Sequence, residues 1–206
     1  MMPRPWQPSA AAAPPKLLDT REAPSAWAGI ESALGEIVVA FGHGVSRALE
    51  FGVEWGYSAV ALSNYFDVVV GVDPLLQESP AGFAEATYQR LRPYANVVLV
   101  RTGWELWAKA QRGLHARYDL VHVDIDPHDY AMTYAAGMWA ALHSPLVIFH
   151  DTQNTRECWT RTADGPRIST EGTEVTRAVG DIAAKLGREF WEWKEAPHGL
   201  GILAGG

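Results

Sequence analysis

Short apolar runs alternate with helical stretches along most of the chain, and this alternation restricts the possible folds more than any other feature. The apolar runs are candidate strands at Arg47–Val53, Val68–Asp73, Asn96–Arg101, Asp119–Asp124 and Pro145–His150. Apolar residues at helical spacing follow them at Ser58–Phe66, Ala81–Arg92, Trp104–Arg112, Tyr130–Leu142 and Thr173–Leu186. Alternating strands and helices form βαβ units, which build a mostly parallel sheet with helices on both faces. We therefore predict an α/β fold with a Rossmann-like, doubly wound sheet.

The two ends of the chain follow different patterns. Two late apolar runs, Glu189–Trp193 and Gly199–Leu203, are separated by a turn-like stretch and predict a C-terminal antiparallel hairpin, which gives seven strands in all. Residues 1–25 are rich in proline and alanine, so we expect a flexible arm, or a segment that orders only on contact. Helical spacing begins at Trp27, and residues 26–206 are expected to form the domain.

Composition limits the possible classes of protein. The chain has 206 residues, of which 48% are hydrophobic, and this suits one globular domain. A formal net charge of −7 argues against nucleic acid as the main partner, because phosphate binding needs a basic face. No window reaches the roughly 18 apolar residues of a membrane span, and the N-terminus lacks the apolar core of a signal peptide. The single cysteine, Cys158, cannot form an intramolecular disulfide, so we expect a soluble protein of the reducing cytoplasm. Whether it forms a homo-oligomer is left open.

The first predicted strand ends in a glycine turn, "EFGVEWGYS" at residues 50–58. Glycines such as Gly52 and Gly56 let the backbone turn sharply and let a ligand approach closely. The dinucleotide fingerprint would be G-x-G-x-x-G, whereas this chain has G-x-x-x-G with Glu54 inside the turn. A carboxylate there would repel a pyrophosphate, but Glu50 and Glu54 suit a ligand that carries a cationic sulfonium and an ammonium group. A purely structural turn is the alternative.

The next two strand ends also carry candidate ligand contacts. Asp73 follows the second strand, where a carboxylate can accept hydrogen bonds from both ribose hydroxyls. Its alternative role is a helix cap or turn former before Pro74. Gly103 and Trp104 follow the third strand, and a small turn before a large flat side chain could flank an adenine ring. Packing at the start of a helix is the alternative for Trp104.

Acidic and histidine side chains follow the fourth and fifth strands, which should end side by side. They are Asp124, Asp126, His128, His150 and Asp151. Clustered carboxylates are costly unless a cation or protonation neutralises them, and a divalent metal is one solution. Neighbouring imidazoles can act as general bases near neutral pH. Helix capping is the alternative for Asp126 and for Asp129, and we adopt it for Asp129.

With these motifs the chain resembles the class I S-adenosylmethionine-dependent methyltransferases, from about Trp27 to Leu203. "EFGVEWGYS" resembles their first motif and "VVGVD" their ribose-binding strand end. "YDLVHVDIDPHDY" and "LVIFHDT" are similar to a branch of small-molecule O-methyltransferases that includes macrocin-type sugar methyltransferases and cephalosporin hydroxylase-type proteins. That branch has Asp-Gly-Asp-His-x-Tyr after the fourth strand. Here Ile125 replaces the glycine, and Pro127 is an extra residue.

The resemblance implies methyl transfer from S-adenosylmethionine to a hydroxyl group of a small-molecule acceptor. It implies cofactor contacts at Glu50, Gly52, Trp55, Gly56, Tyr57, Ser58, Asp73, Gly103, Trp104 and Asp124. Two other interpretations stay open. One is a non-catalytic binding module with the same fold, and the other is a nicotinamide-dependent oxidoreductase or epimerase, against which the missing third glycine counts.

The resemblance also implies a divalent metal such as Mg²⁺, held by Asp124 and Asp151, with Asp126 as a further candidate. Such a metal would lower the pKa of the acceptor hydroxyl and orient it. His150 or His128 would take the proton. The polar segment from Arg156 to Glu174 has no period, and we expect it to form a lid or substrate loop.

Overall fold

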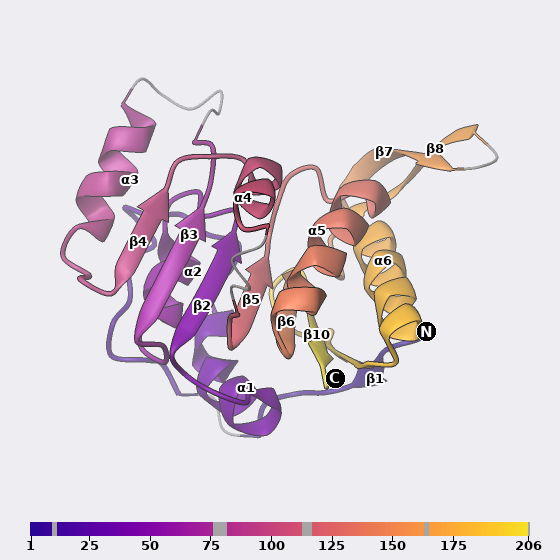
Figure 1. Ribbon diagram of the computed structural model, residues 1–206, viewed down its shortest axis with the longest axis horizontal. Coiled ribbons are helices and arrows are strands. Elements are labelled where there is room, and N and C mark those ends of the chain that lie inside the picture. Colours follow the sequence, from indigo (N-terminus) through magenta and orange to yellow (C-terminus); the bar gives the residue numbers. More distant parts are fainter. Residues whose placement is uncertain (10–11, 76–81, 113–116, 163–164, 206) are drawn as a thin grey trace.

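The predicted alternation of strands and helices is present in the computed structural model, which describes residues 1–9, 12–75, 82–112, 117–162 and 165–205. Eight strands form one sheet in the order β1-β9-β10-β6-β5-β2-β3-β4 (Figure 1). Their bounds are β1 (Arg4–Pro5), β2 (Arg47–Phe51), β3 (Val68–Val72), β4 (Val97–Val100), β5 (Leu120–Val123), β6 (Leu146–His150), β9 (Glu189–Trp193) and β10 (Leu200–Ala204). The predicted fold class is confirmed, and every predicted parallel strand ends within two residues of its expected end.

The order of the strands defines where a ligand is expected. Strands β6, β5, β2, β3 and β4 run parallel, and β10 runs antiparallel to both β6 and β9. The chain builds the sheet from β2 outward to β4, and then returns to β5 on the other side of β2. In open α/β sheets, ligands bind at the carboxyl ends of the strands, beside such a reversal. The ends of β2 and β5 are therefore the place to search for a site.

Helices cover both faces of the sheet and create two apolar cores. The helices are the 3-10 helix η1 (Ile30–Ala33), α1 (Leu34–Phe41), α2 (Tyr57–Leu62), α3 (Phe83–Leu91), α4 (Trp104–Ala110), α5 (Tyr130–His143) and α6 (Glu171–Leu186). Leu34 and Leu62 belong to the core under η1, α1 and α2. Ala140 and Val179 belong to the opposite core, under α5 and α6. Because both faces are buried, the strands read as continuous apolar runs. Ala81, the predicted start of the third helix, lies outside the described residues.

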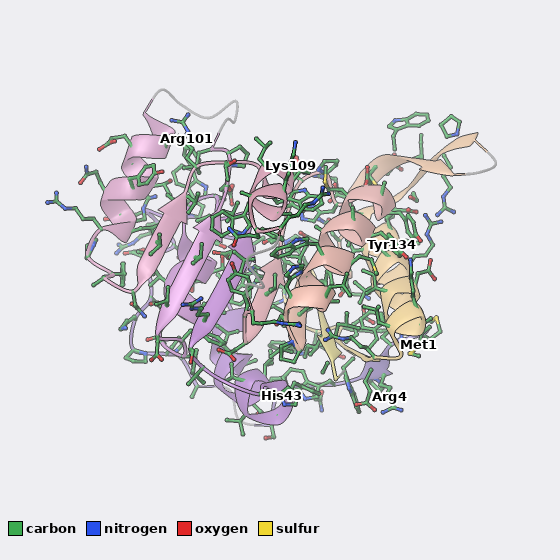
Figure 2. All side chains as sticks on the ribbon, viewed as in Figure 1. Met1, Arg4, His43, Arg101, Lys109 and Tyr134 are labelled. Carbon is green, nitrogen blue, oxygen red and sulfur yellow. The ribbon has the colours of Figure 1, made fainter. Side chains whose placement is uncertain are left out.

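The N-terminal segment adds an eighth strand that the sequence did not predict. Strand β1 pairs in parallel with β9, and Arg4 forms an ion pair of 2.7 Å with Glu189. The Met1 amine donates to the carbonyl of Gly180 in α6 at 3.0 Å, and Figure 2 shows Met1 and Arg4 on this side of the molecule. Trp6 packs edge-on against Trp193. The described part of residues 1–25 thus contacts the domain, which corresponds to a segment that orders on contact.

The polar segment that was expected to be an irregular loop contains regular structure. Strands β7 (Glu157–Thr162) and β8 (Gly165–Thr170) form a separate antiparallel hairpin that projects beyond α5 and α6 (Figure 1), and α6 then begins at Glu171. Trp159 and Ile168, a cross-strand pair, are both exposed. The segment lacks an apolar alternation, so the sequence carried no strand signal.

Among the described residues, no helix combines the length and the apolar character that crossing a membrane requires.

Candidate active site

A cavity of about 570 Å³ opens at the carboxyl ends of β2, β3, β5 and β6, beside the reversal of strand order. Nearly all of the site residues predicted from the sequence line it. They are Gly52, Trp55, Tyr57, Ser58, Asp73, Gly103, Trp104, Asp124, Asp126, His128, His150 and Asp151. Glu50 and Gly56 are not part of the lining. Sequence regions up to a hundred positions apart are thus brought to one space.

The glycines of the turn are explained by packing against protein atoms. Gly52 and Gly56 both have φ of 87°, a conformation that other residues rarely adopt. A Cβ atom on Gly52 would lie 1.6 Å from the backbone oxygen of Asp124, and one on Gly56 would lie 2.7 Å from the Leu91 side chain. The turn therefore lets the end of β2 approach the chain that follows β5. Gly52 also lines the cavity, and the cofactor contacts of the two glycines stay a prediction.

Asp73 holds the glycine turn from the neighbouring strand. Its side chain is buried, and Oδ2 accepts hydrogen bonds from the backbone N–H groups of Val53 (2.8 Å) and Glu54 (2.9 Å). Oδ1 accepts from the N–H of Leu75 at 2.7 Å, so Asp73 does act as a turn former. Asp73 also lines the cavity, and Oδ1, which accepts one hydrogen bond, has a further lone pair. The ribose role therefore stays a prediction that this geometry allows.

Glu50 points away from the cavity into a buried hydrogen-bonded chain. Trp27 Nε1 donates to His122 Nε2 at 3.1 Å, and because an indole only donates, His122 Nε2 must be the acceptor. His122 Nδ1 then carries the proton and donates to Glu50 Oε1 at 2.9 Å. Burial raises the pKa of Glu50, although the bond to His122 opposes this. His122 was missed because a lone histidine in an apolar strand gives no signal. Trp27, which lines the cavity, was interpreted only as the start of the helical spacing.

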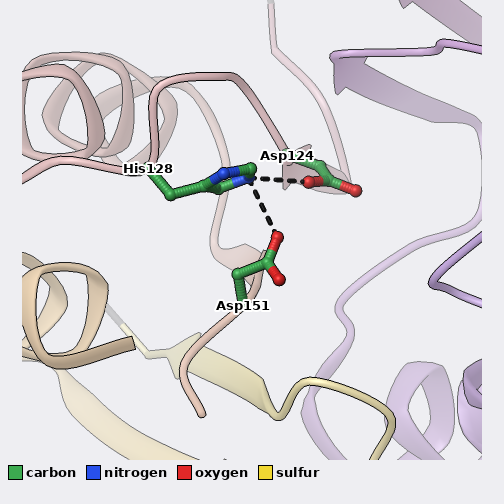
Figure 3. Close-up of side chains that lie close together, drawn as sticks. All are labelled: Asp124, His128 and Asp151. Atoms are coloured by element: carbon green, nitrogen blue, oxygen red, sulfur yellow. Dashed lines mark hydrogen bonds and ion pairs between the residues drawn. The ribbon is translucent and has the colours of Figure 1, made fainter. Parts of the chain in front are cut away.

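Asp124, His128 and Asp151 meet as the sequence predicted (Figure 3), and His150, the last residue of β6, lies beside both carboxylates. His128 Nε2 lies 3.0 Å from Asp124 Oδ1 and 3.0 Å from Asp151 Oδ2. His150 Nδ1 lies 3.3 Å from Asp124 Oδ2 and 3.2 Å from Asp151 Oδ2. Asp126 differs from these residues, since 66% of its side chain is exposed and it forms an ion pair of 2.6 Å with Arg156.

The two carboxylates hold protons on the two imidazoles. Burial alone would lower the pKa of His128, but the hydrogen bonds and charges of Asp124 and Asp151 raise it to about 10. The same balance, with the charge of Asp124 as the largest raising cause, brings the pKa of His150 to about 10. His150 Nε2 must donate to the Pro197 carbonyl at 3.2 Å, so Nδ1 is the atom that faces the carboxylates. In the metal-free protein, neither imidazole is ready to take a proton at neutral pH.

This charge pattern predicts how the stability of the metal-free protein depends on pH. The pKa of each histidine is about 10 in the folded state, above the ordinary value of 6.5, so the stabilisation is fully present below about pH 6.5. It is lost as the pH rises toward 10. We expect the Tm, measured in chelator, to fall steadily from pH 6.5 to 9.5. The double variant His128→Asn, His150→Asn should show a flatter profile; a Tm that rises over this range in the parent would contradict the assignment.

A second layer of polar side chains surrounds the cluster and was missed from the sequence. Asn154 Nδ2 donates to Asp151 Oδ1 (2.8 Å) and to Glu171 Oε2 (2.9 Å). Arg156 Nε donates to Glu171 Oε1 at 2.6 Å, and Arg156 also binds Asp126. These residues lie at the base of the β7–β8 hairpin and at the start of α6, far in sequence from β5. Only the three-dimensional contact identifies them.

The cluster has the chemistry of a metal site. Within the described residues, one ligand atom each from Asp124, His128 and Asp151 lies within 4.8 Å of the others, and so does one each from Asp126, His128 and Glu171. His128 Nδ1 is buried and has no hydrogen-bond partner among the described residues. Carboxylate oxygens and imidazole nitrogens are both common ligands of divalent metals. The residues present therefore fit a divalent cation.

The fold matches those of known methyltransferase structures. An O-methyltransferase from Bacillus cereus, in complex with SAH, has a TM-score of 0.61 at 14% identity, with 85% of this chain and 80% of that chain covered. SAM-bound CalS10, an amino pentose methyltransferase from Micromonospora echinaspora, has a TM-score of 0.56 at 15% identity (89% and 93% covered). TomG, an O-methyltransferase from Streptomyces achromogenes in complex with SAM, has a TM-score of 0.54 at 18% identity (85% and 79% covered).

These similarities establish the fold, and they confirm the Rossmann-like methyltransferase architecture expected from the sequence. No protein-family model and no curated protein matches the chain.

Proposed function

We propose that the protein is an S-adenosylmethionine-dependent methyltransferase that methylates an oxygen atom of a small hydroxylated metabolite with the help of a divalent metal. The observation that carries this proposal is a single cavity that joins two different halves. The lining that follows β2, β3 and β4 includes the glycine turn, Asp73 and Trp104, and we call it the donor half. The lining that follows β5 and β6 includes Asp124, His128 and Asp151, and we call it the acceptor half. The first half suits the donor, and the second suits an acceptor that must lose a proton.

The donor half is acidic, which favours a cationic ligand. Glu54 lines the cavity, and burial, followed by the charges of Asp124 and Asp73, raises the pKa of its carboxyl group. Burial disfavours charge of either sign, but the contributions of Asp124 and Asp73 to this raised pKa mean that a positive charge is favourable here. A ligand with a sulfonium and an ammonium group supplies positive charge, whereas the pyrophosphate of a nicotinamide dinucleotide supplies more negative charge. This difference favours the methyltransferase over the oxidoreductase or epimerase.

Methyl transfer from sulfur to oxygen is an in-line displacement, so much of the catalysis would come from positioning the two partners. The donor half of the cavity would hold the sulfonium, and the acceptor half would orient the hydroxyl group. A divalent cation held by Asp124 and Asp151 would lower the pKa of that hydroxyl group. His128 and His150 would hold or accept protons at Nε2 and Nδ1, the atoms that face the two carboxylates.

Binding and turnover separate this proposal from its alternatives. Calorimetry should show binding of S-adenosylmethionine and S-adenosylhomocysteine and none of NAD. Methylated product should then form in the presence of a divalent metal and a set of hydroxylated acceptors. Cofactor binding without product from any acceptor would favour the non-catalytic binding module.

We also place the protein in the cytoplasm, because its one cysteine, Cys158, is free and buried.

The donor half gives a specific prediction at Asp73. Replacing it with asparagine removes a charged acceptor, and the loss of such a hydrogen bond costs about 1.5–3 kcal/mol. We expect Asp73→Asn to weaken S-adenosylhomocysteine binding by about 10- to 150-fold in calorimetry. Asp119→Asn is the matched control, because Asp119 accepts a backbone hydrogen bond from Arg47 at 2.9 Å and does not line the cavity. Parental affinity in the Asp73 variant would leave Asp73 as a turn former only.

A further inference from the structure

We propose that His128 is itself a metal ligand, and that the site, with its mixed nitrogen and oxygen donors, prefers a transition-metal dication such as Mn²⁺ or Co²⁺ over Mg²⁺. This inference rests on the metal-assisted function proposed above, but it concerns a different property of the site. It replaces the expected role of His128 as a base and the expected role of Asp126 as a ligand.

The first argument is the position of His128 Nε2. It lies 3.0 Å from Asp124 Oδ1 and 3.0 Å from Asp151 Oδ2, on the side of the ring that faces both carboxylates (Figure 3). Bonds of about 2.1 Å to a common metal place neighbouring ligands of an octahedron about 3 Å apart. The side chain is 14% exposed, so its surroundings fix the ring. The three atoms, which all lie within 4.8 Å of one another, can therefore be ligands of one cation.

Hydrogen bonds alone would give similar distances, so the opposite nitrogen of the ring decides between the two explanations. His128 Nδ1 is buried without a hydrogen-bond partner among the described residues. Two carboxylate oxygens are close to it, Glu171 Oε2 at 3.8 Å and Asp126 Oδ1 at 3.9 Å. A histidine that binds a metal through one nitrogen normally directs its other N–H toward a carboxylate, which fixes the tautomer. At His128 the two carboxylates stand beside Nδ1 but beyond hydrogen-bond distance, so a small shift of either one would complete this arrangement.

The outer carboxylate is itself held in place. Glu171 is 1% exposed, and both of its oxygens accept hydrogen bonds, Oε1 from Arg156 and Oε2 from Asn154. Asp126 is largely exposed and bound to Arg156, so it suits the outer layer better than the metal itself. The inner carboxylates, Asp124 and Asp151, thus lie at Nε2 of His128. The outer carboxylates, Glu171 and Asp126, lie near Nδ1.

The donor set determines which metal is preferred. Mg²⁺ is a hard cation that selects oxygen ligands and keeps several waters, and an imidazole adds little to its affinity. Mn²⁺ and Co²⁺ accept imidazole nitrogen together with carboxylate oxygen, and affinity for a given site generally rises from Mn²⁺ to Co²⁺. Exchanging an oxygen ligand for His128 Nε2 should therefore shift the preference away from Mg²⁺.

The experiment is a calorimetric titration of the full chain, stripped of metal by chelator, with Mg²⁺, Mn²⁺ and Co²⁺. We expect Co²⁺ to bind at least about tenfold more tightly than Mg²⁺ and to show visible absorption bands of a nitrogen-ligated ion. His128→Asn should weaken Co²⁺ at least about tenfold, change Mg²⁺ little and alter the Co²⁺ spectrum. The control is His43→Asn, since His43 is exposed and does not line the cavity, and this variant should change neither affinity nor spectrum.

A second variant keeps the test decisive if His128→Asn does not fold. Glu171→Gln leaves the imidazole in place but replaces the carboxylate beside Nδ1 with a neutral amide. The loss of such an outer partner typically costs about 10–100-fold in metal affinity. Equal affinity for Mg²⁺ and Co²⁺ in the parent, or an unchanged Co²⁺ spectrum in the His128 variant, would overturn the inference. The proposed methyltransferase would then still stand if S-adenosylhomocysteine binds, whereas tight Co²⁺ binding without S-adenosylhomocysteine binding would overturn only the proposed function.

Discussion

Replacing Asp151 with asparagine is expected to lower the turnover of methyl transfer by at least about a hundredfold. Partners in the outer layer of a metal site already cost about 10–100-fold when they are removed, so a direct ligand should cost at least as much as the upper value. The affinity for S-adenosylhomocysteine should change little, because Asp151 belongs to the acceptor half of the cavity. Turnover is measured with S-adenosylmethionine and an accepted substrate, and affinity by calorimetry.

The matched control for Asp151 is Asp119→Asn, which removes a carboxylate that does not line the cavity. It should retain turnover within a few-fold of the parent at saturating donor. Chelator added to the parent protein should reproduce the Asp151→Asn result. Full activity in chelator, together with an active Asp151 variant, would remove the metal from the mechanism and leave proton transfer to the protein side chains alone.

The second large effect is expected on stability, at Gly52. Alanine there would place a Cβ atom 1.6 Å from a backbone oxygen of the chain after β5, which cannot move without breaking the end of the sheet. Left-handed strain costs about 1–2 kcal/mol, and forced overpacking about 1–3 kcal/mol more. We expect Gly52→Ala to lower the free energy of unfolding by about 3 kcal/mol or more, or to prevent folding.

A second glycine separates the two causes. Gly187, at the end of α6, also has positive φ, at 66°, but a Cβ atom there would meet nothing within 4 Å. Gly187→Ala should therefore cost only the conformational part, about 1–2 kcal/mol. The free energy of unfolding of both variants is to be measured by urea denaturation. Similar losses in the two variants would show that the close approach to Asp124 is unimportant.

The parallel part of the sheet could be predicted because its strands are buried on both faces. Such strands read as short apolar runs, and turn residues mark where each one ends, so β2, β3 and β5 were found nearly to the residue. The cluster of Asp124, His128 and Asp151 followed from the same reasoning, since neighbouring parallel strands end at one edge. Local pattern and simple topology were enough for that half of the site.

The remaining parts depend on contacts that leave no local pattern. Strand β1 has two residues and lies in a proline-rich segment, so it has no period to detect. Glu171 reads as an ordinary acidic residue at the start of a helix, yet it is buried under the cluster. Glu50 was assigned to the cavity because it precedes the glycine turn, but alternation along β2 directs it toward His122 instead. In each case the partner lies far away in the sequence.

The pairing of β1 with β9 has a consequence for how the chain reaches its final state. Arg4 and Glu189 are 185 positions apart, so the N-terminal segment leaves the ribosome long before its partner strand is made. Contacts of this separation form late, because the entropy of closing the intervening loop must be overcome first. Until the segment docks, β9 is an open sheet edge, and unpaired edges are where newly made chains associate with one another. Docking of residues 1–9 therefore covers the middle of this edge, at Trp191 and Glu192, in the finished protein.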